Sequence, residues 1–187
     1  MTQKKKTKDI SIYQLKITLD GIRPPIWRRI QVKSDITLYH LHRIIQTIMD
    51  WDGYHLHQFR FGNIVYSVPH PDDFYDIEDE RNVKLSQVIT QEKARFVYQY
   101  DFGDSWEHRI LVEKILPMEA DKSYPICLKG KRACPPEDCG GVYGYYDFLE
   151  AIQDPEHPEH EEMIDWVGYD FDPEYFDLDV INAVLTV

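Results

Sequence analysis

Four segments in which apolar residues recur at every second position constrain the fold of this chain most. These segments are residues 10–19, 26–32, 94–102 and 106–116. A period of two places alternate side chains on opposite faces of a strand, so each segment is expected to form a strand with one buried face. The first pair is joined by a short turn at residues 20–25, and the second pair meets at a tight turn, as in antiparallel hairpins. We therefore expect an antiparallel sheet.

Helical spacing is clearest between the second and third of these strands. Apolar residues recur from Leu38 to Ile48 behind Thr37, an expected N-cap, and Asp52-Gly53 is expected to end the helix. A hairpin is expected over residues 55–67 and one helical turn over residues 83–89. The order β-β-α-β-β-β-β resembles a β-grasp arrangement, so the predicted class is α+β, with an antiparallel-rich sheet wrapping one main helix.

The C-terminal third is expected to be helical and to pack on this sheet. Its aromatic content favours helices over residues 145–153, 158–167 and 173–185 that complete the core. The expected organisation is one α+β domain over residues 10–187 behind a basic disordered tail at 1–9. That domain divides into a sheet and helix core at 10–117, a cysteine-containing loop at 118–142 and an acidic helical part at 143–187.

Charge is distributed very unevenly along the chain. The net charge is −12, yet residues 135–187 contain 15 carboxylates and no lysine or arginine, which leaves residues 1–134 with a net charge of +3. Nucleic acid is therefore disfavoured for residues 135–187 and only doubtful for the rest. The acidic helices either are simply solvated or dock to a basic partner, which we expect to be a protein.

No segment predicts export or membrane insertion. The first ten residues lack the apolar stretch of a signal peptide, and no apolar run approaches the roughly 20 residues that span a bilayer. The chain has only three cysteines, and this small, odd number does not favour a disulfide framework. We expect a cytoplasmic protein that does not bind membranes.

The turn near residue 104 concentrates groups capable of chemistry. Asp101, Asp104, Glu107 and His108 are candidate catalytic residues, because carboxylates beside an imidazole can hold a cation or share a proton. The alternative is a purely structural turn, since Asp and Gly satisfy turn geometry and Trp106 would cover the core. The Asp-Phe-Gly tripeptide at residues 101–103 lacks the other kinase motifs, so a kinase is excluded.

The cysteines form the second candidate site. Cys134 and Cys139 are spaced like half of a zinc site, and Cys127 precedes them by seven residues. A structural zinc needs four ligands, so the third and fourth would have to come from Cys127 or from a distant histidine such as His57, His108, His157 or His160. Zinc is a possible cofactor, and buried or reversibly oxidised thiols are the alternative.

The third candidate is a polar pocket on the core side of the sheet. Arg28 and His57 share the phase of buried neighbours, so Arg28 is expected to pair with Asp101 or Asp104, because an unpaired buried guanidinium is costly. The alternatives are an arginine that reaches water and a histidine that makes an ordinary core hydrogen bond.

Several segments together resemble the plasmid pRiA ORF-3-like family, first named from a root-inducing (Ri) plasmid. They are residues 24–29, 38–46, 98–108, 133–141, 144–145 and 171–176. The resemblance covers about residues 10–185 and implies a compact α+β domain without an established activity. Members occur in bacteria and archaea, often on plasmids or beside insertion elements, and some carry a resolvase-like label. Ser11 lies in an expected strand and the last 53 residues hold no cation, so we predict no recombinase activity.

Three functions remain open from the sequence. The first is a non-catalytic binding or adaptor domain associated with mobile-element or plasmid gene neighbourhoods, with Trp27, Arg28, His57 and Trp106 as binding residues. Its contact surface would be the acidic helices or the face of Trp27 and Arg29. The second is a metal-dependent hydrolase using the cluster near residue 104. The third is a nucleic-acid module acting through the N-terminal part.

Overall fold

One sheet organises the molecule. The computed structural model describes residues 10–70 and 77–185, so the expected tail at residues 1–9 lies outside the described residues. Within that part, eight strands lie in the spatial order β5-β4-β3-β6-β7-β1-β2-β8, all antiparallel to their neighbours except β4 and β5. The strands are β1 Ser11–Leu19, β2 Trp27–Lys33, β3 His57–Phe61, β4 Ile64–Ser67, β5 Glu78–Asp79, β6 Arg95–Tyr100, β7 Trp106–Pro117 and β8 Ile126–Lys131.

The alternating segments form the centre of this sheet. β1 lies between β2 and β7, with Leu15 opposite both Ile30 and Val112, and all three side chains are fully buried. Opposed apolar pairs on one face fix the register, because a shift by one residue would turn the buried side chains to solvent. The predicted α+β class is confirmed.

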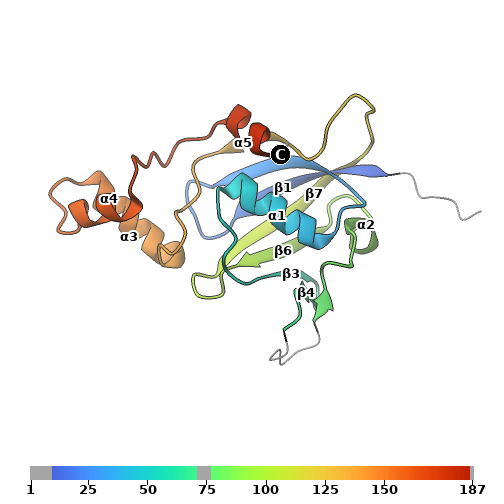
Figure 1. The fold of residues 1–187 in the computed structure, drawn as a ribbon, viewed down its shortest axis with the longest axis horizontal. Coiled ribbons are helices and arrows are strands. Elements are labelled where there is room, and N and C mark those ends of the chain that lie inside the picture. The colour runs from blue at the N-terminus through green and yellow to red at the C-terminus, as the bar shows by residue number, and fades with distance from the viewer. Residues whose placement is uncertain (1–9, 71–76, 186–187) are drawn as a thin grey trace, which may run out of the picture.

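Helix α1 covers the face of the sheet toward which these side chains point (Figure 1). The helices are α1 Leu38–Met49, α2 Leu85–Val88, α3 Gly141–Gln153, α4 His160–Val167 and α5 Leu178–Leu185. Thr37 caps α1 as expected, because its hydroxyl accepts the amide N–H of His40. The prediction that the helix stops at residues 52–53 is wrong. The helix ends at Met49, because the next residue, Asp50, adopts a left-handed conformation with φ 58°.

One strand lies inside the segment predicted as a loop. Residues 126–131 form β8, which pairs with β2 at the edge of the sheet. Its three apolar residues, Ile126, Cys127 and Leu128, are consecutive and Gly130 follows them, so alternation did not reveal it. A Cβ added to Gly130 would lie 2.4 Å from the ring of Phe176, which explains why a glycine occupies this position in a strand.

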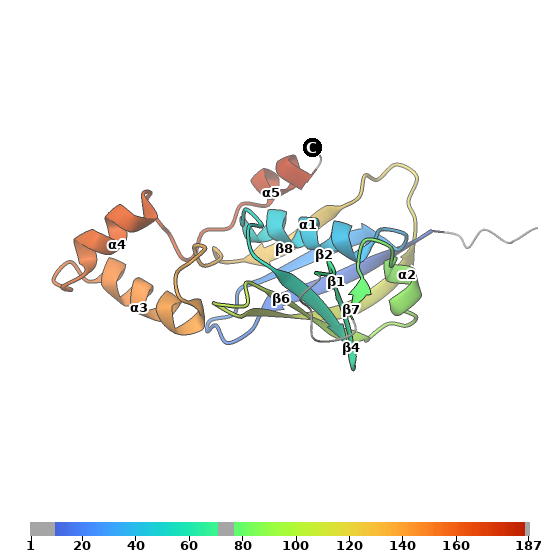
Figure 2. The ribbon, with the colours of Figure 1, turned by 60° about the horizontal axis from the view of Figure 1, so that its bottom comes forward.

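The C-terminal helices take two different positions (Figures 1 and 2). α5 lies beside α1 and β8, whereas α3 and α4 form a hairpin that extends beyond the end of the sheet. Tyr145 and Phe148 of α3 are nevertheless buried and continuous with the core, and Phe148 contacts Trp166 of α4 edge to face at 5.7 Å. None of the helices in the described part of the chain is long and apolar enough to cross a membrane.

Candidate functional site

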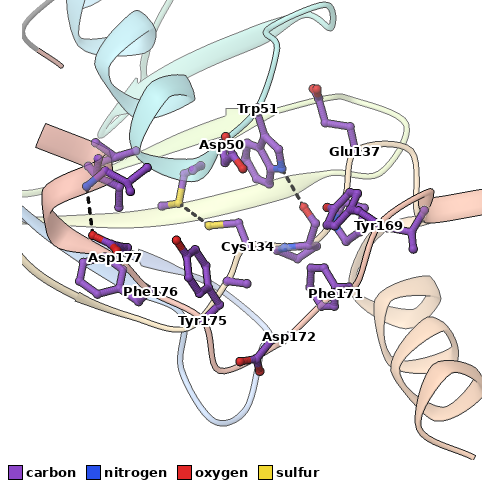
Figure 3. Close-up of a pocket in the computed structure, with 18 of the residues that line it drawn as sticks. Asp50, Trp51, Cys134, Glu137, Tyr169, Phe171, Asp172, Tyr175, Phe176 and Asp177 are labelled. Carbon is purple, nitrogen blue, oxygen red and sulfur yellow. Dashed lines mark hydrogen bonds between the residues drawn. The ribbon is translucent and has the colours of Figure 1, made fainter. Parts of the chain in front are cut away.

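A cavity of about 810 Å³ opens between α1 and the C-terminal part of the chain. Its walls come from three segments that are far apart in sequence: residues 47–52 at the end of α1, residues 133–138 after β8, and residues 166–184 from the end of α4 to α5. Figure 3 shows Tyr169 and Phe171 on one side of Cys134 and Tyr175 on the other, with Trp51 above them. A cavity of this size can hold a small molecule or a few side chains.

Acidic and aromatic side chains dominate this lining. Seven carboxylates line the cavity: Asp50, Asp52, Glu137, Asp138, Asp170, Asp172 and Asp177. Six aromatic residues join them: Trp51, Trp166, Tyr169, Phe171, Tyr175 and Phe176. The cation among the lining residues is Arg28, and it is 3% exposed. The chemistry of the cavity therefore favours a positively charged ligand with some apolar surface.

Hydrogen bonds fix the floor of the cavity. The indole Nε1 of Trp51 donates to the carbonyl of Pro135 at 2.9 Å, and the Cys134 thiol lies 3.2 Å from the Met49 sulfur (Figure 3). These contacts join the end of α1 to the segment after β8. Because Trp51 is only 6% exposed, its ring is a rigid part of the wall.

Arg28 is buried as expected, but the expected carboxylate partner is wrong. Its Nη2 donates to the sulfur of Cys134 at 3.2 Å, and its guanidinium carbon lies 4.8 Å from the centre of the Phe176 ring. The other guanidinium hydrogen bonds go to three backbone carbonyls, those of Ile48, Trp27 and Lys131, at 2.9–3.1 Å. Carbonyl dipoles and an aromatic face thus satisfy this charge in place of Asp101 or Asp104.

The three cysteines are not brought together as a ligand set. Cys127 and Cys134 are buried and Cys139 is partly buried, and all three are free thiols. Burial raises the pKa of each thiol, that of Cys139 to about 12, which disfavours the thiolate that would bind zinc. Among the described residues, no cysteine belongs to a group of three potential metal ligands.

The four residues proposed near the turn at residue 104 are dispersed by strand geometry. Glu107 and His108 are neighbours on β7, so they point to opposite faces of the sheet. Glu107 pairs with Arg60 on the open face, whereas His108 is completely buried. Asp101 and Asp104 remain in the turn, where Oδ1 of Asp101 accepts backbone amides and Oδ2 of Asp104 accepts the amide of Gly140.

His108 is a structural residue of the core. Its Nδ1 donates to the carbonyl of Trp106 at 3.1 Å, and its buried Nε2 finds no hydrogen-bond partner among the described residues. Burial lowers the pKa of His108 to about 4, so the ring is neutral near pH 7. Trp106 is likewise 1% exposed, which removes both residues from any accessible site.

His57 faces the core as predicted and belongs to a buried polar group. Its Nε2 lies 2.8 Å from Oε1 of Glu80, a carboxylate with no exposed surface, and its ring stacks on His42 at 3.5 Å. Burial, then the neighbouring His57 and Arg43, lower the pKa of His42 to about 3. His42 lies among the buried residues of α1 and could have been found from its helical position, whereas nothing in the sequence marks Glu80.

The face of Trp27 and Arg29 is largely occupied by its own side chains. Lys16 and Arg29 lie 5.1 and 5.3 Å from the Trp27 ring centre, and Arg29 makes two hydrogen bonds to the carboxylate of Glu113. Arg29 in turn lowers the pKa of Glu113. On this face, the Trp27 ring is therefore already in contact with Lys16 and Arg29, and Arg29 is already paired with Glu113.

The cavity itself was missed by sequence reasoning. Two of its three walls come from segments that looked like a loop and a helix, and only their packing creates the space between them. A usable signal existed in residues 169–177, where aromatic and acidic residues alternate without helical spacing.

Comparisons with known proteins agree with this fold. Residues 11–180 match the family described as plasmid pRiA4b ORF-3-like protein. The uncharacterized protein y4hQ of Sinorhizobium fredii is 37% identical over 177 residues, covering 94% of this chain and 91% of that protein. The crystal structure of MM3350 from Methanosarcina mazei Go1, a protein of unknown function, matches with a TM-score of 0.84 and 42% identity, covering 92% of this chain and 98% of that chain. The chain therefore belongs to the plasmid pRiA4b ORF-3-like family.

Proposed function

We propose that this chain is a binding domain that receives a positively charged segment of a partner protein in the cavity between α1 and α5. The observation that carries the proposal is the lining, in which seven carboxylates and six aromatic rings surround about 810 Å³. Clefts lined by one sign of charge raise the local concentration of oppositely charged ligands. A lysine or arginine side chain supplies both the charge and the apolar stem that such walls accept.

The rings at the cavity mouth support recognition of a cation. Tyr169 and Tyr175 are 59% and 56% exposed although they are large aromatic side chains. Exposed rings next to carboxylates are suited to cation–π contact, which contributes about 0.5–2 kcal/mol per pair. The buried guanidinium of Arg28 does not compete for the carboxylates, because backbone carbonyls and Phe176 already satisfy it.

The charge distribution of the folded chain disfavours the nucleic-acid alternative. A nucleic-acid surface needs cations that are free to meet phosphates. Residues 10–134 contain 17 basic and 17 acidic residues, and several arginines of the sheet region are paired with carboxylates, which leaves fewer cations free to meet phosphates. These pairs are Arg29–Glu113, Arg60–Glu107, Arg81–Asp79, Arg109–Asp20 and Arg132–Glu174.

The hydrolase alternative loses two of its four residues. His108 has no access to solvent, and Glu107 lies on the opposite face of the sheet and pairs with Arg60. A general acid or base must reach its substrate within hydrogen-bond distance, which a fully buried imidazole cannot do. We therefore favour binding over catalysis by this cluster.

The test compares two variants that change net charge equally. A pocket variant carries Asp→Asn at residues 50, 52, 170 and 172, and a control variant carries Glu→Gln at residues 156, 159, 161 and 162, which are exposed on and before α4. Fluorescence anisotropy would follow binding of a labelled peptide of alternating lysine and glycine, with a glutamate–glycine peptide as the charge control, over a salt series.

The expected result is binding of the lysine peptide that weakens with salt, is reduced at least about tenfold in the pocket variant and is nearly unchanged in the control variant. Asparagine keeps the oxygen with which Asp172 accepts the amide of Glu174, so the pocket variant should fold. Equal losses in both variants would show that only overall charge matters, and the proposal would then be wrong.

A further inference from the structure

Three potential metal ligands from three different segments meet at one end of the sheet. His55 lies between α1 and β3, Asp101 follows β6, and Asp138 lies between β8 and α3. Nε2 of His55 is 3.1 Å from Oδ1 of Asp138 and 3.7 Å from Oδ2 of Asp101, and one ligand atom from each residue lies within 4.8 Å of the others. Folding thus brings together one imidazole and two carboxylates that are far apart in the sequence.

Backbone contacts hold the three segments together independently of these side chains. The amide of Asp101 donates to the carbonyl of Leu56 at 2.9 Å, and the amide of Gly140 donates to Oδ2 of Asp104 at 3.1 Å. The approach of the third segment is so close that a Cβ on Gly141 would lie 2.5 Å from the carbonyl oxygen of Asp104. The ligands are therefore positioned before any ion arrives.

Glu137 adds a further tie beside the cluster. One of its carboxylate oxygens accepts the hydroxyl of Tyr100, and the other accepts the amide of Asp52 at 2.8 Å. The segment that carries Asp138 is thus fastened to β6 and to the segment before His55. A supporting shell of this kind is what keeps ligands in place in metal sites.

Asp101 has one oxygen committed to the turn and one directed at the cluster. Its Oδ1 accepts the amide of Gly103 at 2.9 Å, while Oδ2 faces His55. The side chain is only 11% exposed, so this second oxygen lies in a largely water-poor environment. A cation shared with the other two ligands would compensate this carboxylate.

The surroundings leave the cluster open to a ligand on one side. Tyr54 and Leu56, which flank His55, are 82% and 70% exposed, and Phe102, which follows Asp101, is 48% exposed. Exposed apolar side chains that gather in one place form the kind of surface that meets another molecule. An ion held here would keep coordination positions directed at that surface.

We propose that His55, Asp101 and Asp138 bind one divalent transition-metal ion, Zn²⁺ or Mn²⁺. A mixed set of imidazole and carboxylates suits these ions better than Mg²⁺ or Ca²⁺, which prefer oxygen ligands alone. Ligand atoms about 2.1 Å from a common ion and 90–110° apart are separated by roughly 3.0–3.4 Å, close to the 3.1 and 3.7 Å from Nε2 of His55 to the two carboxylates. The site does not depend on the proposed peptide binding, although Asp138 also lines the cavity.

Isothermal titration calorimetry of metal-free protein without an affinity tag tests the site, with ZnCl₂ and MnCl₂ titrated separately. The variants His55→Gln, Asp101→Asn and Asp138→Asn remove one ligand each. The controls are His157→Gln, a histidine beside two exposed glutamates, and Asp147→Asn, an exposed carboxylate on α3. Electron paramagnetic resonance of Mn²⁺ would report protein-bound ion directly.

We expect one ion per chain, weakened at least about tenfold by each ligand variant and less than about twofold by either control. Asparagine at position 101 keeps the acceptor for the Gly103 amide, and circular dichroism would confirm folding. If that variant is unfolded, His55→Gln and Asp138→Asn still decide the matter, because both positions are at least partly exposed. No saturable binding to the wild type, or equal loss in the controls, would overturn the proposal.

Discussion

Acid should destabilise this protein chiefly through two buried histidines. His42 and His108 have pKa values lowered to about 3 and about 4, mainly because burial penalises the charged imidazole. In the unfolded chain both would titrate near the ordinary value of about 6.5. Between these limits the unfolded chain binds more protons than the folded one, so the free energy of unfolding falls as the pH falls below about 6.5.

The size of the effect follows from proton linkage. Between pH 7 and pH 5 each histidine should remove about 2 kcal/mol from the free energy of unfolding, or about 4 kcal/mol together. That is a large part of the roughly 5–15 kcal/mol by which domains are usually stable. A proton on His42 would lie beside a second imidazole, because its ring stacks at 3.5 Å on that of His57. Its Nδ1 lies 2.7 Å from the hydroxyl of Tyr98, which also accepts the side-chain amide of Gln46.

Urea unfolding at several values between pH 7 and pH 5 measures this slope. Asparagine can imitate the Nδ1 of histidine, so His42→Asn and His108→Asn remove the titration while keeping a group for the local hydrogen bond. Each variant should be less stable at pH 7 but should lose about 2 kcal/mol less on acidification than the wild type. The variant that combines His42→Asn and His108→Asn gives the sharpest comparison. The reasoning is refuted if its free energy of unfolding depends on pH in the same way as that of the wild type.

Three further substitutions test individual contacts of the fold, each by the urea midpoint at pH 7. Gly130→Ala should destabilise the protein by about 1–3 kcal/mol, because its Cβ would lie 2.4 Å from Phe176 and 2.8 Å from Cδ of Arg28; an unchanged midpoint would contradict this contact. Thr37→Ala should cost about 1 kcal/mol by removing the acceptor for the His40 amide, and Thr37→Ser should restore most of that loss. Arg28→Met should cost about 1–3 kcal/mol for each buried carbonyl left without a donor, and a neutral effect would show that water replaces it.

Local patterns determined the centre of the fold, and long-range packing determined its edges. The central strands and α1 could be predicted because alternation and helical spacing encode which face is buried. β5 and β8 could not, because an edge strand needs little apolar alternation when one neighbour supplies the pairing. The end of α1 was misplaced because the helix already ends at Asp50, a left-handed residue, before it reaches Gly53, which also has a positive φ.

The candidate site was less predictable than the fold, for the same physical reason. Sequence neighbours such as Glu107 and His108 were grouped, although a strand sends them to opposite faces. The partners that do meet, such as His55 with Asp138, are separated by more than eighty residues, and only tertiary structure brings them together. Arg28 was correctly placed inside, but the carbonyls that satisfy its charge leave no trace in a sequence.

The walls of the cavity also set the order in which the molecule can acquire function during synthesis. β1 to β7 and α1 are complete by residue 117, yet the cavity needs residues 133–138 and its far wall runs to residue 184. Synthesis proceeds from the N-terminus at about 5–20 residues per second, so a folded sheet can exist for several seconds before the cavity closes. A ribosome-bound or truncated chain that ends before α5 would therefore lack part of the far wall and, with it, the proposed peptide site.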